Sequence, residues 1–94
     1  MPQVDARAAV QLAEQYFVSL YDPKTFKRVR VEEIEREFDG DWLWRITLGY
    51  DVEVEGDDNP FTILHTPAKY KREFKQFVIS EKTGQVLAMR IRTP

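Results

Sequence analysis

The chain has 94 residues, a length at which one hydrophobic core forms and a second domain has no room. Its 14 basic and 16 acidic residues give a formal net charge of −2, which excludes a global attraction to nucleic acid or anionic lipid. Hydrophobic residues make up 43% of the chain and aromatic residues 13%, which excludes the composition typical of intrinsic disorder. We therefore expect a single globular domain over residues 1–94.

Cysteine is absent, which excludes disulfide frameworks, zinc ribbons, iron–sulfur clusters and thiol nucleophiles. The sequence also has no apolar run of the length typical of a secretory leader or a membrane-spanning helix. We therefore expect a cytoplasmic protein that makes no contact with a membrane.

Apolar residues recur every three or four positions from Asp5 to Tyr21, a pattern that predicts an amphipathic helix. The carboxylate of Asp5 is suited to accept from the free amides of a first turn, so it is the expected N-cap. Asp22-Pro23 provides a stop signal. Because Ala9 and Ala13 are small and lie on the apolar stripe, the helix is expected to pack closely on a sheet.

Alternation of apolar and basic residues from Phe26 to Val31 predicts a strand. Ile34 and Phe38 then change parity, so a continuous strand needs a bulge near Glu32-Glu33 to keep its apolar residues on one face. The alternative is a short helix over residues 31–38 that ends at Gly40. We favour the strand because an Asp-Gly turn and an alternating segment follow, as in a hairpin.

Alternation over residues 42–54, with Leu43 as the one apolar residue at an odd position, is the clearest pattern in the chain. It has a period of two, which predicts a strand buried on one face. The even positions carry the apolar residues, namely Trp42, Trp44, Ile46, Leu48, Tyr50, Val52 and Val54.

Residues 68–80 fit either a helix or a strand. Aromatic residues at positions 70, 74 and 77 match a helical stripe, whereas the β-branched residues at 78 and 79 favour a strand. We predict a strand, because the basic residues at 69, 71 and 72 would crowd the positive end of a helix dipole. Gly84 is suited to the positive φ of a hairpin turn, and a last strand is expected over residues 85–92.

These elements predict an α+β fold in which one N-terminal helix packs on a curved four-stranded antiparallel meander, in the order α-β-β-β-β. This order resembles the cystatin-like group of folds. The stretch from Phe77 to Leu87 also resembles the last hairpin of PepSY-type modules, with Ser80 where an aspartate is usual. The resemblance implies a fold without implying an activity. Inhibition of cysteine proteases does not carry over, because the Gln-x-Val-x-Gly hairpin of inhibitory cystatins is missing.

The chain offers few residues for catalysis or metal binding. His65 is the only histidine, and Ser19 and Ser80 are the only serines, so we interpret all three as structural. The acidic segment around Asp57 matches no calcium-loop spacing and is interpreted as solvated, with weak calcium binding as the alternative. The glycines are scattered, which excludes a phosphate-binding loop. We therefore expect no catalytic residue, no metal and no cofactor.

Two groups of residues are candidates for binding. The sequence places Trp42 and Trp44 in the core, with a partly exposed tryptophan that anchors a partner as the alternative. The other group comprises basic residues on parities opposite to the apolar ones. These basic residues form either a solvated face, with Asp51, Glu53 and Glu73 as cross-strand partners, or a docking surface for an acidic protein. The basic group consists of Arg28, Arg30, Arg45, Arg90 and Arg92, with Lys69, Lys71, Arg72 and Lys75 as further candidates.

The leading hypothesis is a non-enzymatic protein-interaction or regulatory module that binds another protein. The alternative is a small NTF2-like enzyme or small-molecule-binding protein that uses Trp42, Trp44, Tyr50 and a buried carboxylate, and a closed apolar pocket would favour it. A nucleic-acid partner is not expected. Any homodimer is expected to pair through the last strand, because Gln85–Met89 is short and uncharged whereas the first strand is crowded with Arg and Glu.

Overall fold

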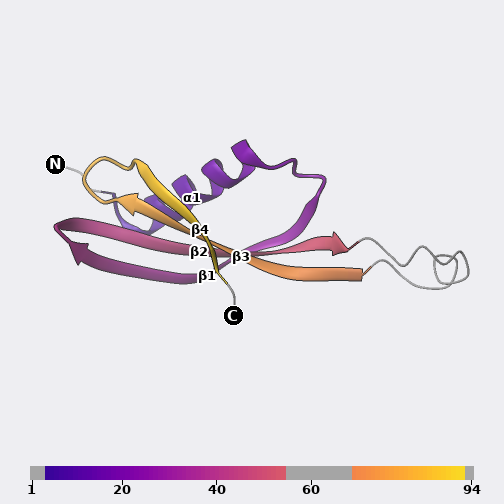
Figure 1. Cartoon of the computed structure of the whole chain (residues 1–94). Coiled ribbons are helices and arrows are strands. Elements are labelled where there is room, and N and C mark those ends of the chain that lie inside the picture. Colours follow the sequence, from indigo (N-terminus) through magenta and orange to yellow (C-terminus); the bar gives the residue numbers. More distant parts are fainter. Residues whose placement is uncertain (1–3, 55–68, 93–94) are drawn as a thin grey trace, which may run out of the picture.

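The computed structural model describes residues 4–54 and 69–92 and contains one helix and four strands (Figure 1). The strands form one antiparallel sheet in the order β1-β2-β3-β4, so β1 and β4 are its edges. The predicted α+β fold and its α-β-β-β-β order are confirmed. Predictions for His65 and the acidic segment around Asp57 lie outside the described residues. The elements are α1 (Ala6–Leu20), β1 (Phe26–Asp39), β2 (Asp41–Val54), β3 (Lys69–Ser80) and β4 (Val86–Arg92).

Helix α1 begins and ends where the sequence predicts. The Oδ1 atom of Asp5 accepts from the backbone N–H of Ala8 at 2.8 Å, which satisfies a free amide of the first turn. At the other end, the N–H of Tyr21 donates to the carbonyl of Phe17 at 3.2 Å. The chain just before the helix is tied to the sheet, because Val4 donates its N–H to the carbonyl of Glu81 at 2.9 Å.

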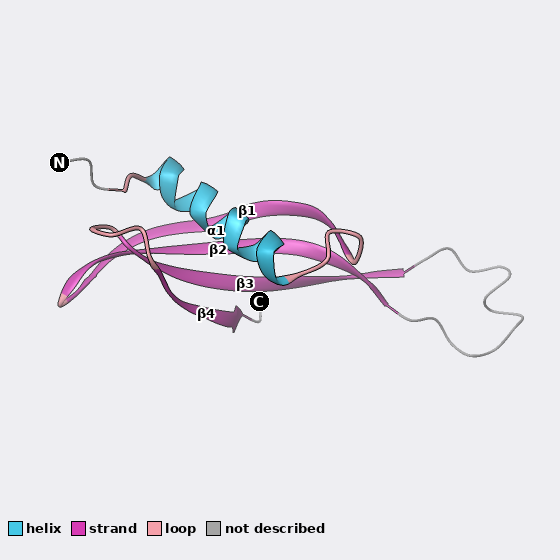
Figure 2. Ribbon diagram, turned by 90° about the horizontal axis from the view of Figure 1, so that it is seen from above, coloured by secondary structure: helices cyan, strands magenta, loops and turns pink. Residues whose placement is uncertain are grey.

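Helix α1 runs obliquely over one face of the sheet and packs on β2, β3 and β4 (Figure 2). Phe17 is at the centre of this contact, with its ring centroid 4.5 Å from that of Phe26 and 4.8 Å from that of Tyr50. Ala9 and Ala13 are fully buried, which confirms the expected close approach of helix to sheet. The buried core consists of Ala9, Ala13, Phe17, Ile46, Leu48, Tyr50, Phe77 and Ile79.

Strand β1 contains the predicted bulge. The ladder with β2 shifts register between Val31 and Glu33, so residues 31–38 are strand and the helical alternative is wrong. A second shift lies between Lys27 and Arg30, where Arg28 adopts a positive φ of 55°. The hairpin turn closes at Gly40, whose φ of 76° suits a residue without a side chain.

Residues 68–80, whose sequence fits both a helix and a strand, contain strand β3, as predicted. It pairs with β2 without a register shift, from Leu43 opposite Ser80 to Val54 opposite Lys69. This pairing places Phe77 opposite Ile46 on the face under the helix. Long-range pairing with β2 and β4 therefore decides the conformation that the local pattern leaves open.

Most of β1 lies outside the cover of the helix. Every residue from Arg30 to Asp39 is exposed, because α1 packs on the three other strands. The apolar side chains that the sequence places on one face of β1 are consequently in contact with solvent.

Candidate functional site

Four large apolar side chains lie exposed on the helix-side face of the β1–β2 hairpin. The register pairs Ile34 with Ile46 and Phe38 with Trp42, which puts them on the same face as the core. Their exposed fractions range from 37% to 60% although other residues of that face are buried. We call the group the aromatic tip patch; it consists of Val31, Ile34, Phe38 and Trp42, with Arg36 between them.

The side chain of Trp42 is held in place by its neighbours. The Phe38 ring centroid is 5.2 Å from that of Trp42, and the guanidinium carbon of Arg36 lies 3.9 Å from the Trp42 ring centroid. This cation–π geometry fixes the indole before any partner arrives. An anchor that is already ordered loses little conformational entropy on binding.

Arg36 is itself anchored by Glu81, in the turn after β3. Its Nε donates to Oε1 at 2.7 Å and its Nη2 donates to Oε2 at 2.9 Å, a bidentate pair. The hydrogen bond from Arg36 lowers the pKa of Glu81, and the same bond raises the pKa of Arg36. The backbone N–H of Glu81 also donates to the carbonyl of Trp42 at 3.1 Å. The pair therefore stays ionised at neutral pH and connects the patch to the β3–β4 turn.

The two tryptophans have different environments. Trp44 is half-buried, and its Nε1–H donates to the carbonyl of Val4 at 2.8 Å. Trp42 is 44% exposed at the end of the sheet, beyond the helix. The prediction of a core position therefore fits Trp44. Trp42 is exposed, which agrees with the alternative of a tryptophan available to a partner.

The face of the sheet away from the helix carries a polar groove of about 360 Å³. Arg45 is paired there with Glu37 and donates to Oε1 of Gln76 at 3.4 Å. Within residues 4–54 and 69–92, neither Arg90 nor Arg92 forms an ion pair. The lining residues are Glu35, Glu37, Arg45, Gln76, Arg90, Ile91 and Arg92.

The other predicted basic residues are separated from this groove. Asp51 binds two arginines, Arg28 at 3.3 Å and Arg72 at 3.0 Å. Arg72 also pairs with Glu32, and Arg30 lies exposed on the edge strand β1. Carboxylates that the sequence analysis did not consider, from β1, are thus interspersed with the arginines.

Lys75 does not belong to this face. Its register partner is Leu48, so it lies on the helix side of the sheet, and the expectation that it joins the basic residues is wrong. Glu73 is opposite Tyr50 on that same side, so it is not a partner for the arginines. The physical reason is the alternation of β3, which places both side chains on the face of Phe77.

Because Gly49 has no side chain, the ion pair between Glu32 and Arg72 can lie directly over its backbone. A Cβ atom at this position would lie 2.6 Å from Oε1 of Glu32 and 2.8 Å from Nη2 of Arg72. We predict that Gly49→Ala forces the pair apart and lowers the free energy of unfolding by about 1 kcal/mol, measured by urea denaturation. In the background of Glu32→Ala the same substitution has more room and should cost less. Equal costs in the two backgrounds would contradict this interpretation.

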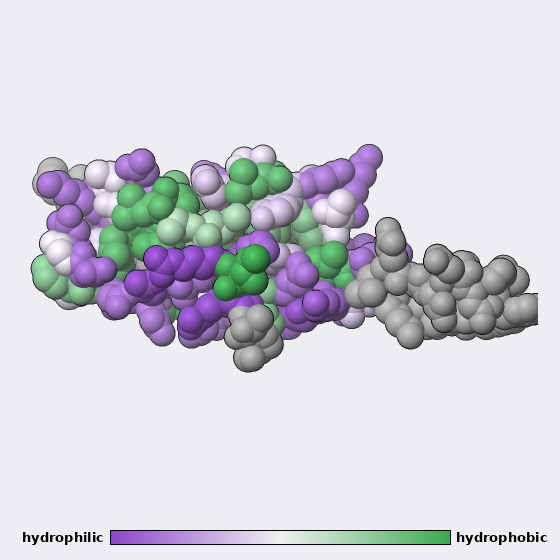
Figure 3. Space-filling view, in the orientation of Figure 1, coloured by the Kyte–Doolittle hydropathy of each residue, from purple (hydrophilic) through white to green (hydrophobic). Residues whose placement is uncertain are grey.

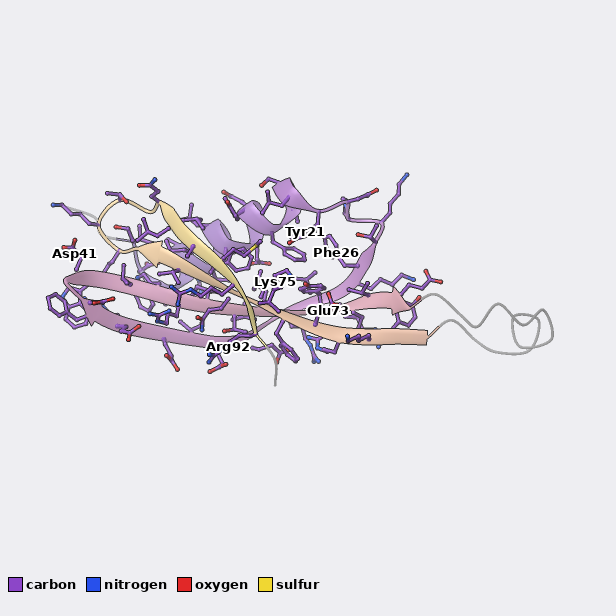
Figure 4. All side chains as sticks on the ribbon, in the orientation of Figure 1. Tyr21, Phe26, Asp41, Glu73, Lys75 and Arg92 are labelled. Carbon is purple, nitrogen blue, oxygen red and sulfur yellow. The ribbon has the colours of Figure 1, made fainter. Side chains whose placement is uncertain are left out.

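A second polar cluster lies beneath the end of α1, where Tyr21, Glu73 and Lys75 come close together (Figure 4). The hydroxyl of Tyr50 donates to Oε1 of Glu73 at 3.3 Å. Burial raises the pKa of Tyr50 above its ordinary value near 10. Burial lowers the pKa of Lys75, but hydrogen bonding to Tyr50 and nearby charge outweigh it, so the net shift is upward. A general base needs a pKa near neutrality, so both shifts run against base catalysis here.

The described residues contain no metal-binding group and no membrane-spanning helix. Within residues 4–54 and 69–92, no three His, Asp or Glu side chains are grouped as a metal site requires. The helix in that part of the chain is too short and too polar to cross a bilayer. Of the predicted binding residues, Trp42 lies in the aromatic tip patch, and Arg45, Arg90 and Arg92 line the polar groove.

Sequence reasoning did not single out Val31, Ile34 and Phe38 as binding residues, because it considered only the tryptophans and the basic residues as candidates. The parity of Ile34 and Phe38 correctly indicates their face, but it carries no information on how far the helix reaches. Arg36 lies opposite Trp44 and diagonally across from Trp42 in the ladder, so the hairpin register predicted from the Asp39-Gly40 turn was the available signal.

Comparison with known proteins does not place the chain in a family. No family model matches it, and neither a curated protein nor a solved structure does. What the chain does has to be inferred from its two surfaces and their chemistry.

Proposed function

We propose that this chain is a non-enzymatic protein-interaction module, of cystatin-like or PepSY-like architecture, that binds another protein through the aromatic tip patch. The observation that carries the proposal is the exposure of Val31, Ile34, Phe38 and Trp42 together on one face of an edge hairpin. Contiguous apolar surface on a soluble protein typically marks a contact site. Tryptophan and arginine are also the residues most enriched among those that dominate binding energy.

The chemistry of the patch favours an apolar partner surface. Arg36 is neutralised by Glu81, so the patch presents rings and methyl groups with little net charge. We therefore expect an affinity that changes little between low and high salt. Docking of an acidic partner on Arg90 and Arg92 would instead weaken steeply as salt screens the charges.

The interior supports a binding module over an enzyme or carrier. The face beneath the helix is filled by Phe17, which packs against Phe26, Tyr50 and Phe77. The groove on the other face is lined mainly by arginine, glutamate and glutamine side chains, unlike an enclosed apolar pocket. Apolar and polar surface are also separated on the outside, with apolar residues gathered around α1 and β4 and a hydrophilic band along the sheet (Figure 3).

Truncation of the exposed tryptophan tests the proposal. With the full chain as bait in the cells from which it derives, Trp42→Ala should lose partners that the wild-type chain retains. The matched control is Leu87→Ala, since Leu87 is a comparably exposed apolar residue, 53% accessible, on β4. With a purified partner, Trp42→Ala should raise Kd about thirtyfold, the effect of losing a residue worth about 2 kcal/mol.

Two results would contradict the proposal. One is binding of the same partners by Trp42→Ala and wild type with equal affinity. The other is a partner whose Kd rises steeply with salt and responds to charge reversal at Arg90 and Arg92, which would assign the function to the polar groove.

A further inference from the structure

We propose that two copies of this chain associate through β1, edge to edge and antiparallel, to form one continuous sheet across a twofold axis. The inference does not rest on the proposed function, because it uses the backbone edge of β1, although Val31 and Ile34 of the aromatic tip patch also take part in the pairing. The sequence analysis expects a homodimer to pair through the last strand, and we now propose that it pairs through the first.

The outer edge of β1 is unpaired among the described strands. Strand order places β1 at the end of the sheet, so one set of its backbone N–H and C=O groups has no ladder partner there. A long edge strand of this kind is a template for pairing with another chain. Strand β1 spans Phe26–Asp39, whereas the other edge, β4, spans only Val86–Arg92.

The charges of β1 are separated along the strand. Its first half carries the cations Lys27, Arg28 and Arg30, and its second half is rich in glutamate. Antiparallel pairing of two identical strands brings the first half of one against the second half of the other. Away from the axis, cations of one strand therefore lie opposite carboxylates of the other.

One register matches the faces of both strands across the axis. With Val31 opposite Ile34 of the partner subunit, apolar residues meet on the helix side, and Arg30 meets Glu35 of the partner subunit on the other side. The bulge between Val31 and Glu33 makes this possible, because it changes the parity at the centre of the strand. Shifting the register by two residues would place Val31 opposite Glu32, or Ile34 opposite Glu33, and these residues lie on different faces of the sheet.

The two charged residues that meet in this register have no ion-pair partner among the described residues. Within residues 4–54 and 69–92, neither Arg30 nor Glu35 forms an ion pair, and both are exposed. At the axis this register places Glu32 opposite Glu33 of the partner subunit, and the ion pair of Glu32 with Arg72 compensates part of that negative charge. The pairing would thus satisfy free charges twice, once on each side of the axis.

A twofold axis perpendicular to the sheet leaves both helices on the same face. The uncovered helix-side faces of the two β1 strands then form one surface between the helices. Two aromatic tip patches consequently face the same direction, and the dimer could engage a partner at two points.

Cross-linking with engineered cysteines tests the register, because the chain has no cysteine of its own. Under mild oxidation, a mixture of Val31→Cys and Ile34→Cys chains should form a disulfide-linked heterodimer faster than either chain alone. The two positions are directly opposite in the proposed register, at a spacing that suits a disulfide. No preference for the mixed pair would overturn the register.

Charge reversal tests the edge by sedimentation of the full chain. Arg30→Glu and Glu35→Arg should each raise the Kd of the dimer about tenfold, because like charges then oppose each other at two places. The double variant Arg30→Glu/Glu35→Arg should recover the wild-type Kd, and circular dichroism shows whether each variant is folded. A monomeric wild type, or a dimer that ignores these changes and is lost with Leu87→Arg on β4, would overturn the proposal.

Discussion

Replacing Phe17 with alanine is expected to lower the free energy of unfolding by about 3–5 kcal/mol. Phe17 is 1% exposed and is the residue through which the helix contacts the sheet. Its ring lies 5.1 Å from that of Tyr21, 4.5 Å from that of Phe26 and 4.8 Å from that of Tyr50, measured between centroids. The substitution removes these contacts and leaves a cavity between the helix and the sheet.

A loss of this size is a large fraction of the stability of a small domain, which is typically about 5–15 kcal/mol. Guanidinium denaturation followed by tryptophan fluorescence should therefore show a midpoint near the start of the titration. The matched control is Leu20→Ala, in the same helix but half exposed, which should cost much less. A Phe17→Ala variant as stable as Leu20→Ala would show that the helix does not hold the sheet through this ring.

The predictable part of the fold came from periodicity. Alternation across β2 indicates which residues face the helix, and the spacing of Ala9, Ala13 and Phe17 indicates which residues face the sheet. Both patterns arise because one face of each element is buried along most of its length. The bulge near Glu32 was predictable from parity alone, since only a parity change keeps Val31 and Ile34 on one face, although that face of β1 is exposed in the structure.

The unpredictable part depends on distances that the sequence does not contain. Phe38 and Trp42 are exposed because the helix begins short of the tip of the β1–β2 hairpin. The periodicity of the sequence gives no information on that distance. The pairs Arg36–Glu81 and Arg72–Glu32 join residues far apart in the chain, so their charges could be counted but not matched. The face of the sheet on which Lys75 lies was predictable, because Lys75 and Phe77 are two residues apart on the same strand. The hypothesis of a basic surface overlooked this alternation.

Replacing Glu81 with glutamine is expected to produce the second-largest loss of stability at neutral pH. The residue is 5% exposed, its carboxylate accepts two hydrogen bonds from Arg36, and its backbone joins Val4 to Trp42. The amide that replaces it can accept only one of those two bonds and carries no charge. The loss stays below that of a fully buried pair, because the side chain of Arg36 is 43% exposed and water compensates part of its charge.

The pH dependence of this loss has a definite sign. The hydrogen bond from Arg36 holds the pKa of Glu81 in the folded chain below its ordinary value near 4.5, so the folded state binds the proton less readily than the unfolded state. The stabilisation is fully present above that ordinary value and is lost as the pH falls through the lower, folded pKa. Thermal unfolding of wild type and Glu81→Gln should therefore differ by a constant amount near neutral pH and converge in acid.

Arg36→Gln distinguishes the ion pair from other effects of the substitution, because it removes the same interaction from the opposite side. Its difference from wild type should shrink over the same acidic range, and the double variant should lose little more than either single one. The Phe38–Trp42 contact should also loosen, seen as a red shift of Trp42 fluorescence in a Trp44→Phe background. A difference between wild type and Glu81→Gln that stays constant down to the acid limit would contradict the assignment, since a neutral hydrogen-bonding role would not titrate.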